Sequence, residues 1–189
     1  MTSIRTFIAI DIDEENVVKK ISQVQQRLWK TQATLKLVEP HNLHLTLRFL
    51  GNTQTELIEK VKLKLEEIVF YSFTVNIQQI GGFPNNRRPR IIWAGIQEES
   101  NQLPQIANQL EEKLSELGFP SEKRRFSPHL TIARVRAGKK MNELTTTIAE
   151  LEDTEFGTMR VKCLKLKKSE LTTHGPIYTT LKETCQEDR

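Results

Sequence analysis

The hydrophobic and polar positions of the chain switch between a period of two and a helical period. Residues 3–12 alternate and then run apolar, which is typical of a β-strand. The next segment repeats apolar residues at helical spacing, at Val17, Val18, Ile21, Val24 and Leu28. Asp13 is expected to cap this helix. Thr53 and Glu56 form a capping-box pattern ahead of the apolar stripe of residues 57–68, so a second helix is expected there.

The rest of the chain continues to mix strands and helices. Further helices are expected at 103–117 and, more weakly, at 141–152. Residues 81–90 (GGFPNNRRPR) are expected to form a turn-rich basic loop. Further strands are expected at residues 35–38, 43–50 (ended by Gly51), 73–80, 91–96, 129–135, 159–166 and 177–181. No low-complexity linker divides this pattern, so residues 1–189 are predicted to form a single α+β domain.

Composition narrows the class of protein only a little. The N-terminal apolar run is interrupted by Asp11 and Asp13, which is unlike a signal peptide or a membrane span. Cys163 and Cys185 lack CxxC spacing, so free thiols in a reducing compartment are expected rather than a disulfide or a zinc site. We therefore expect a soluble, cytoplasmic protein, a monomer without a membrane partner. The net charge of +4 favours an anionic partner, although weakly.

Two tetrapeptides share one pattern of histidine, apolar residue, threonine and apolar residue. They are residues 44–47 (HLTL) and residues 129–132 (HLTI). In an extended strand successive side chains point to opposite faces, so His and Thr share one face and the apolar residues share the other. A single histidine on a strand is most often a partly buried residue with a satisfied hydrogen bond. Two copies on one internal repeat instead indicate a shared chemical role.

The two tetrapeptides lie on such a repeat. An offset of 85 residues superposes His44 on His129, and the same offset places Ala9 on Ala94. A duplicated αβ unit explains this register, with halves of roughly 1–85 and 86–189. Two related units commonly pack about a pseudo-two-fold axis, which would bring the two motif strands together at a central groove.

Two facing His-x-Thr pairs suit displacement at phosphorus. Histidine titrates near neutral pH, so one copy, His44 or His129, can act as a base while the other acts as an acid. The hydroxyls of Thr46 and Thr131 can donate hydrogen bonds to oxygens on which negative charge grows. In an in-line displacement the entering and leaving oxygens lie on opposite sides of phosphorus, which matches an acid and a base across a groove. No cofactor is needed.

Other chemistries find little support. His41 and His44 are three residues apart, but no cluster of carboxylates or cysteines joins them, so no metal site is expected. The sequence lacks a GxxxxGK[ST] phosphate loop and a G-x-S-x-G nucleophile elbow.

Basic and aromatic residues near the motifs are candidates for substrate contacts. Arg48 is in phase with His44 on the expected strand and can hold a phosphate, whereas Arg134 follows the second motif out of phase; each is otherwise a solvated strand-end arginine. Phe7 and Tyr178 either stack on a base or belong to the core. Loop residues that track an RNA backbone, or are merely solvated, are Arg87, Arg88, Arg90, Lys123, Arg124 and Arg125.

The chain resembles the 2H phosphoesterases, and among them the bacterial and archaeal RNA 2′,3′-cyclic phosphodiesterases, also called 2′-5′ RNA ligases. The resemblance spans RTFIAIDI (5–12), NLHLTLRFLG (42–51), GGFPNNRRPRIIW (81–93), FSPHLTIARV (126–135), and SEL followed by GPIY (169–178). It implies a bilobal fold in which each lobe is an antiparallel sheet backed by helices, with both motifs in a cleft. It also implies that His44 donates a proton, that His129 accepts one, and that Thr46 and Thr131 contact the phosphate.

The implied activity is metal-independent hydrolysis of RNA 2′,3′-cyclic phosphate ends to 2′-phosphomonoesters. The implied substrates are RNA with such termini, tRNA fragments among them, or small cyclic nucleotides. The alternatives are a 2′-5′ RNA ligase or phosphodiesterase, a phosphodiesterase of small cyclic nucleotides, and an RNA-binding module without catalysis. Two intact motifs disfavour the last, because pure binding does not require either histidine.

Overall fold

The computed structural model describes residues 2–123, 125–173 and 175–186, and confirms the predicted α+β class. Its helices are α1 (Glu15–Lys30), α2 (Thr55–Glu66), α3 (Gln102–Ser115) and α4 (Met141–Glu150), with a short 3₁₀ turn, η1, at Pro40–Asn42. Its strands are β1 (Ser3–Asp11), β2 (Thr34–Leu37), β3 (His44–Gln54), β4 (Phe73–Phe83), β5 (Ile91–Gln97), β6 (His129–Ala137), β7 (Glu155–Val161), β8 (Cys163–Thr172) and β9 (Gly175–Cys185).

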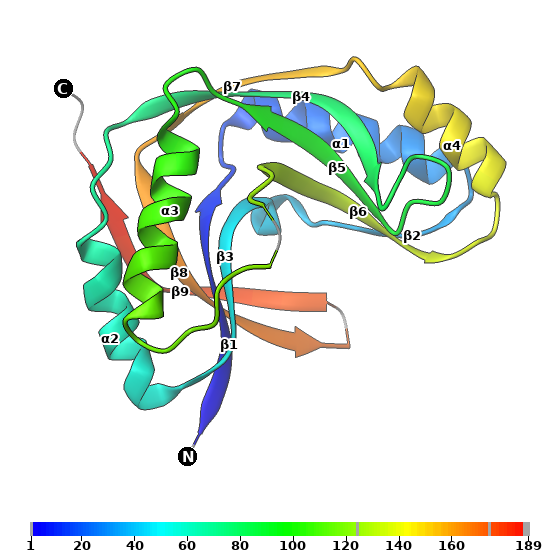
Figure 1. Cartoon of the computed structure of the whole chain (residues 1–189). Coiled ribbons are helices and arrows are strands. Elements are labelled where there is room, and N and C mark those ends of the chain that lie inside the picture. The colour runs from blue at the N-terminus through cyan, green and yellow to red at the C-terminus, as the bar shows by residue number, and fades with distance from the viewer. Residues whose placement is uncertain (1, 124, 174, 187–189) are drawn as a thin grey trace.

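These strands form one antiparallel sheet with two arms (Figure 1). One arm holds β7, β4, β5 and β6, and the other holds β3, β1, β8 and β9, in that order across the sheet. The arms meet where β3 and β6 pair at Leu45 and Leu130, and beyond this point β6 pairs with β2 instead. The expected two sheets are therefore joined through the two motif strands.

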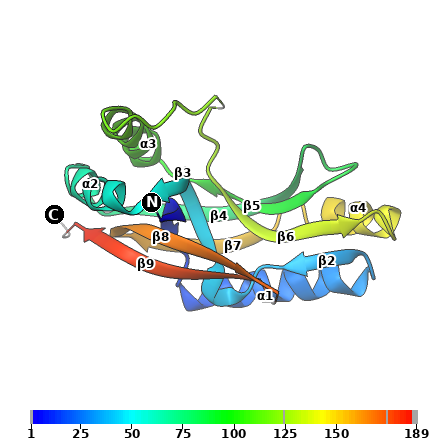
Figure 2. The ribbon, with the colours of Figure 1, turned by 90° about the horizontal axis from the view of Figure 1, so that it is seen from below.

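The helices cover the two arms in an exchanged arrangement. α2 and α3 pack together, α2 also contacts β3, β8 and β9, and α3 contacts β3, whereas α1 contacts β6, β7 and α4 (Figure 2). α1 belongs to the first half of the sequence but lies on the arm of β6, the second motif strand, and α3 belongs to the second half but lies on the arm of β3, the first motif strand. The sequence division near residue 85 thus does not separate the arms in space.

The motif strands bury one face and leave the other accessible. Leu45 and Leu130 are 1% and 0% exposed, and both belong to the apolar core. His44 and His129 are each partly exposed on the opposite face. The period-two pattern predicted from the sequence is therefore confirmed over both motifs.

Several predicted boundaries were wrong. Strand β3 does not end at Gly51 but continues to Gln54, and the hydroxyl of Thr53 bonds that of Thr6 at 2.7 Å rather than capping α2. β4 extends through Gly81, which is not a turn; a side chain there would collide with the indole of Trp93. The strand expected at 159–166 is two strands, β7 and β8.

The expectation of free thiols was also wrong. Cys163 and Cys185 form a disulfide, because they lie directly opposite each other in the antiparallel pair β8–β9. The sequence spacing alone did not reveal this pair, since the hairpin that joins the two strands was not predicted.

None of the helices in the described part of the chain has the length and apolar character needed to span a lipid bilayer.

Candidate active site

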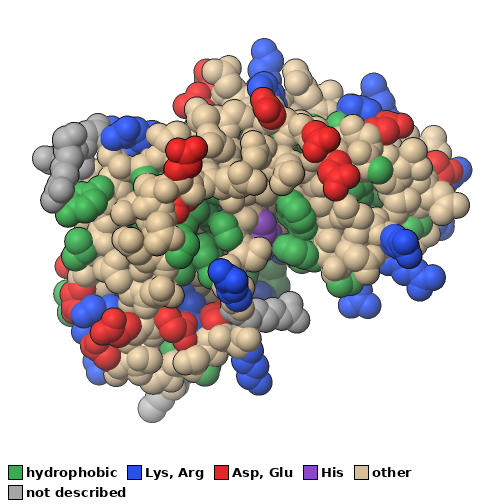
Figure 3. All heavy atoms as spheres, turned by 45° about the horizontal axis from the view of Figure 1, so that its top comes forward, with side chains coloured by type: hydrophobic (Ala, Val, Ile, Leu, Met, Phe, Trp, Pro, Cys, Tyr) green, Lys and Arg blue, Asp and Glu red, His purple; other side chains and the backbone are tan. Residues whose placement is uncertain are grey.

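The pairing of β3 with β6 brings the two motifs together. Because Leu45 is opposite Leu130, the antiparallel register sets His44 opposite Thr131 and Thr46 opposite His129, all on the accessible face. A space-filling view shows the molecule hollowed between the two arms, with a histidine side chain in the hollow (Figure 3). Each histidine thus has the other motif's threonine as its cross-strand neighbour.

The two imidazoles are held in the same way. Nδ1 of His44 lies 2.7 Å from the carbonyl oxygen of Asn42, and Nδ1 of His129 lies 2.8 Å from that of Ser127. A carbonyl oxygen only accepts hydrogen bonds, so each Nδ1 carries the proton and donates it. In both rings this leaves Nε2 to exchange a proton with a substrate.

Both motif strands contain a matching irregularity, which decides where the following residues point. Thr46 pairs with Ala9 but Arg48 already pairs with Ile8, so Leu47 is an extra residue in β3. In β6, Thr131 pairs with Trp93 and Ala133 with Ile92, so Ile132 is extra in the same way. Each bulge moves the residues after it to the opposite face from the one that strict alternation predicts.

The bulge in β3 removes Arg48 from the face of His44, so the predicted phase of this residue was wrong. Its side chain is 7% exposed, and Nε lies 3.3 Å from a carboxylate oxygen of Glu111. The guanidinium also pairs with Glu122 and donates to the carbonyl of Pro120. Arg48 is thus a structural ion-pair partner of α3 and the segment after it.

The bulge in β6 has the opposite effect on Arg134. This exposed residue, expected out of phase, shares the face of His129 and Thr131, and its charge acts on His44 and Tyr178. The equivalent residue of β3, again five after the histidine, is Phe49. The strands that pair with the two motif strands, β1 and β5, are related by a different offset. Ala9 of β1 pairs with Thr46, and Trp93 of β5 pairs with Thr131, so equivalent positions of these two strands are 84 residues apart rather than 85.

An aromatic cluster surrounds His44. Its ring centroid lies 5.0 Å from that of Phe7 and 5.2 Å from that of Tyr178. Phe7 in turn lies 6.4 Å from Phe49. On the other side of the cleft, the ring of Phe83 lies 5.0 Å from His129. Of the two residues expected either to stack on a base or to belong to the core, Phe7 is 4% exposed and therefore buried, whereas Tyr178 is partly exposed beside His44.

Three charged side chains on the strands β1 and β8 interact with one another near His44, and the sequence analysis did not predict this group. Asp11 pairs with His44 in the β1–β3 register and accepts bonds from Lys167 Nζ at 2.6 Å and Lys165 Nζ at 3.0 Å. Lys167 is 5% exposed and is the buried member of this group, whereas the side chains of Asp11 and Lys165 are 24% and 21% exposed. The alternation of Lys165 and Lys167 in the expected strand, with Asp11 at a strand end, was the available signal.

These charges tune His44. Burial lowers the pKa of His44 below its usual value, and the positive charges of Lys167 and Arg134 act in the same direction. The bond to the Asn42 carbonyl and the negative charge of Asp11 oppose them without cancelling the effect. For Asp11 itself, burial raises the pKa, but the bonds from Lys167 and Lys165 outweigh it, and the carboxyl stays ionised.

We expect Lys167→Met to move one limb of the pH profile of kcat/KM. Loss of this positive charge, with Asp11 still present, raises the pKa of His44. If His44 supplies a proton, the alkaline limb moves to higher pH, and the optimum broadens on that side. Lys165→Met is the matched control, since Lys165 also pairs with Glu183, 3.2 Å away, and is expected to shift the limb less. Movement of the acidic limb would instead make His44 the base.

The predicted RNA-tracking loops lie apart from one another in the chain, and only part of them is described. Arg87 and Arg88 are exposed, and their backbone N–H groups donate to Oδ1 of Asn85. Lys123 and Arg125 are exposed on the segment that leads into β6. Arg124 lies outside the described residues. A role for these residues in binding RNA stays a prediction.

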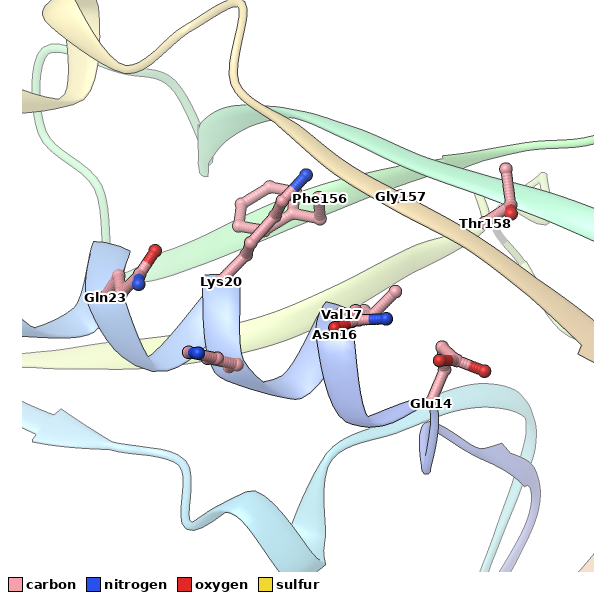
Figure 4. A pocket seen from close by; sticks show the side chains of 9 residues that line it. Glu14, Asn16, Val17, Lys20, Gln23, Phe156, Gly157 and Thr158 are labelled. Carbon is pink, nitrogen blue, oxygen red and sulfur yellow. The ribbon is translucent and has the colours of Figure 1, made fainter.

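Other candidate features lie away from the motifs. A hollow of about 650 Å³ between α1 and β7 is lined by Lys20, Gln23 and Phe156 among others, and contains neither motif (Figure 4). Over the described part of the chain, the one cluster of three metal-binding residue types is Cys163, Glu183 and Cys185, and its two sulfurs are joined in the disulfide.

Comparison with known proteins assigns this arrangement to a class of phosphoesterases. The chain belongs to the family described as AKAP7 2′5′ RNA ligase-like domain, which matches residues 6–184 and confirms the resemblance noted in the sequence. It is 39% identical over 179 residues to an RNA 2′,3′-cyclic phosphodiesterase of Methanocaldococcus jannaschii, covering 95% of this chain and 99% of that protein. It is 37% identical over 178 residues to the protein of the same name from Archaeoglobus fulgidus, with coverage of 94% and 98%.

Solved structures agree with this assignment. The protein TT0787 of Thermus thermophilus is similar with a TM-score of 0.82 and 26% identity, covering 98% of this chain and 99% of that one. LigT of E. coli, in complex with 3′-AMP, is similar with a TM-score of 0.75 and 25% identity, with coverage of 97% and 98%.

Proposed function

We propose that the protein hydrolyses 2′,3′-cyclic phosphate ends of RNA to 2′-phosphomonoesters, with two histidines as acid and base and without a metal ion. The observation that carries this proposal is the paired geometry of the motifs, in which both rings donate Nδ1–H to a backbone carbonyl and keep Nε2 for the substrate. The relatives named RNA 2′,3′-cyclic phosphodiesterase support the substrate class.

In the proposed reaction, Nε2 of His129 accepts a proton from water, and the water oxygen attacks phosphorus. The bond from phosphorus to the 3′ oxygen breaks, and Nε2–H of His44 gives its proton to that oxygen. The product carries a 2′-phosphate and a free 3′ hydroxyl. Thr46 and Thr131 donate hydrogen bonds to the non-bridging oxygens, where charge collects in the five-coordinate state.

The lowered pKa of His44 fits this scheme only with substrate bound. In the free protein the ring is mostly neutral near pH 7, because burial and the charges of Lys167 and Arg134 disfavour its protonation. A phosphate anion beside the ring favours the protonated form and reverses part of this effect. The substrate itself thus helps to charge the acid that completes the reaction.

Arg134 is proposed to hold the substrate phosphate, and the two bulges provide a matched test. Loss of a charge-assisted hydrogen bond generally costs about 1.5–3 kcal/mol. Arg134→Met is therefore expected to lower kcat/KM about 10- to 100-fold with little change in stability, since Arg134 is exposed. Arg48→Met is expected to lower the free energy of unfolding, because it breaks the pairs with Glu111 and Glu122.

For a 2′,3′-cyclic-phosphate mononucleotide, the kcat/KM of the folded Arg48→Met protein is expected to stay within about threefold of the parent. Kinetics and urea unfolding of both variants measure the two effects. A larger kinetic loss in Arg48→Met than in Arg134→Met would reverse the assignment.

A 2′-5′ ligase or phosphodiesterase activity is the second candidate, and one observation favours it. Attack by water requires no nucleoside on the His129 side, yet the ring of Phe83 lies against His129 there, with Trp93 5.5 Å from Phe83. A second nucleoside, whose 5′ oxygen takes the place of water, can stack on this pair.

The assay that tests the proposal uses EDTA-treated protein and three substrates: a 2′,3′-cyclic-phosphate mononucleotide, a dinucleotide with that terminus, and a 2′-5′-linked dinucleotide. We expect turnover of the cyclic phosphates without added metal. Turnover that appears only with a divalent cation would contradict the proposed mechanism.

We also propose a cytoplasmic site of action. Disulfides such as Cys163–Cys185 are more common in proteins of oxidising compartments, but they also occur in intracellular proteins of hyperthermophiles.

A further inference from the structure

One feature of the motif strands breaks the symmetry between the arms. Beyond Ile132, the outer edge of β6 pairs with β2, where Leu35 is opposite Val135. In the 85-residue repeat, the segment equivalent to β2 is residues 119–122. This segment lies beside β3 but forms no strand. Pro120 lies at the centre of this segment and has no N–H to donate to a neighbouring strand. Among the described strands, β3 pairs on that edge only at Leu45.

A hollow of about 340 Å³ lies along this unpaired edge. It is lined by the second half of β3 and the facing segment: Arg48, Phe49, Leu50, Gly51, Phe119, Pro120, Ser121, Glu122 and Lys123. The side chain of Arg48 closes one wall through its bonds to Pro120 and Glu122. Lys123 provides an exposed positive charge in the lining. The hollow therefore has an aromatic wall and a cationic group.

Phe49 connects this hollow to the catalytic cleft. The bulge at Leu47 turns Phe49 to the face of His44 and Thr46, where it contacts Phe7. Its side chain is 57% exposed, so much of its ring is accessible to a ligand. From His44 the aromatic rings lead outward, first to Phe7 and then to Phe49.

We propose that Phe49 is a stacking platform for the base of the nucleoside that precedes the cyclic-phosphate terminus, with the hollow beside it as the subsite. The inference rests on the proposed function and extends it from the reacting group to the length of RNA that is bound. Phe7 lies between His44 and Phe49 but is only 4% exposed, so Phe49 is the accessible ring of this series. Because Phe49 lies farther from the reacting group than the ring of His44, it suits the base of the preceding nucleoside rather than the terminal one. Base–aromatic stacking tolerates any sequence, and Lys123 suits the linking phosphate.

The test compares substrates of one and two nucleosides. Loss of one stacked base generally costs about 5- to 150-fold in affinity. Phe49→Ala is therefore expected to lower kcat/KM about tenfold for a dinucleotide with a 2′,3′-cyclic phosphate, and less than about twofold for the mononucleotide. Phe49→Trp is expected to retain the advantage of the dinucleotide, and Phe49→Leu to lose it, because only a ring stacks.

A dinucleotide whose preceding residue is abasic completes a double-mutant cycle. It should lose the same advantage with the parent protein and no more with Phe49→Ala. Trp29→Ala is the matched control, since Trp29 is 59% exposed but lies on α1 away from the cleft, and both substrates should be unaffected. Equal losses on both substrates, or no loss on either, would overturn the subsite.

A binding measurement separates failure of the subsite from failure of the proposed function. The probe is a 5′-fluorescein dinucleotide with a 2′-phosphate end, followed by fluorescence anisotropy, so that no turnover is required. If no cyclic phosphate is hydrolysed, the proposed function fails. If the Phe49→Ala protein binds the probe as tightly as the parent and the Trp29→Ala control do, the subsite proposal fails, whether or not cyclic phosphates are hydrolysed.

Discussion

Alanine at His44 or at His129 is expected to lower kcat for a 2′,3′-cyclic phosphate by about 10²- to 10⁴-fold, the usual contribution of a positioned acid or base. The protein should stay folded, because both rings lie partly exposed on the face opposite the core. Since the two groups act in one step, the double variant should be little slower than either single variant. His41→Ala is the matched control, because His41 is exposed three residues before His44 and outside the motif.

A substrate with a good leaving group distinguishes the two roles. p-Nitrophenolate departs without a proton, so a p-nitrophenyl phosphodiester needs the base but not the acid. His44→Ala should recover most activity on this substrate, and His129→Ala should not. Recovery by His129→Ala alone would exchange the roles, and activity of either variant within about twofold of the parent on the cyclic phosphate would remove that histidine from the reaction.

Valine at Thr46 or Thr131 is expected to give the second largest effect. The change keeps the branched shape but removes the hydroxyl, and the loss of one donor to a developing oxyanion generally costs about 10²- to 10³-fold in kcat. Both side chains are only partly buried, so the stability of the fold should change little. Because the bond strengthens in the transition state, KM should change much less than kcat.

The conservative variants Thr46→Ser and Thr131→Ser keep the hydroxyl and are expected to retain most of the activity. Steady-state kinetics of the four variants, with thermal unfolding as the check on folding, measure this. A rise in KM at constant kcat would show that the threonines bind the ground state equally well.

The sequence predicts the motif strands and their faces because a period of two is a local property of the chain. It cannot predict the bulges at Leu47 and Ile132, since a bulge is defined by the pairing of two strands that are distant in sequence. Strict alternation therefore assigned Arg48 to the cleft, and missed Phe49 and the cleft-facing position of Arg134.

Other features depend on tertiary contacts in the same way. The ion pair of Lys167 with Asp11 joins residues on two neighbouring strands, and the disulfide joins Cys163 to Cys185 across a hairpin. The repeat offset of 85 correctly relates the motifs, but it does not show that α1 and α3 exchange arms. Packing between distant segments decides each of these, and no local pattern in one sequence reports it.

The product formed from a cyclic-phosphate dinucleotide tests the central claim most directly. The protein is treated with EDTA, incubated with the substrate, and the product examined by phosphorus NMR, which distinguishes a 2′- from a 3′-phosphomonoester. With His129 activating water and His44 protonating the departing 3′ oxygen, we expect the 2′-phosphate, formed at an unchanged rate in EDTA. A dominant 3′-phosphate, or no product until a metal is added, would contradict the account.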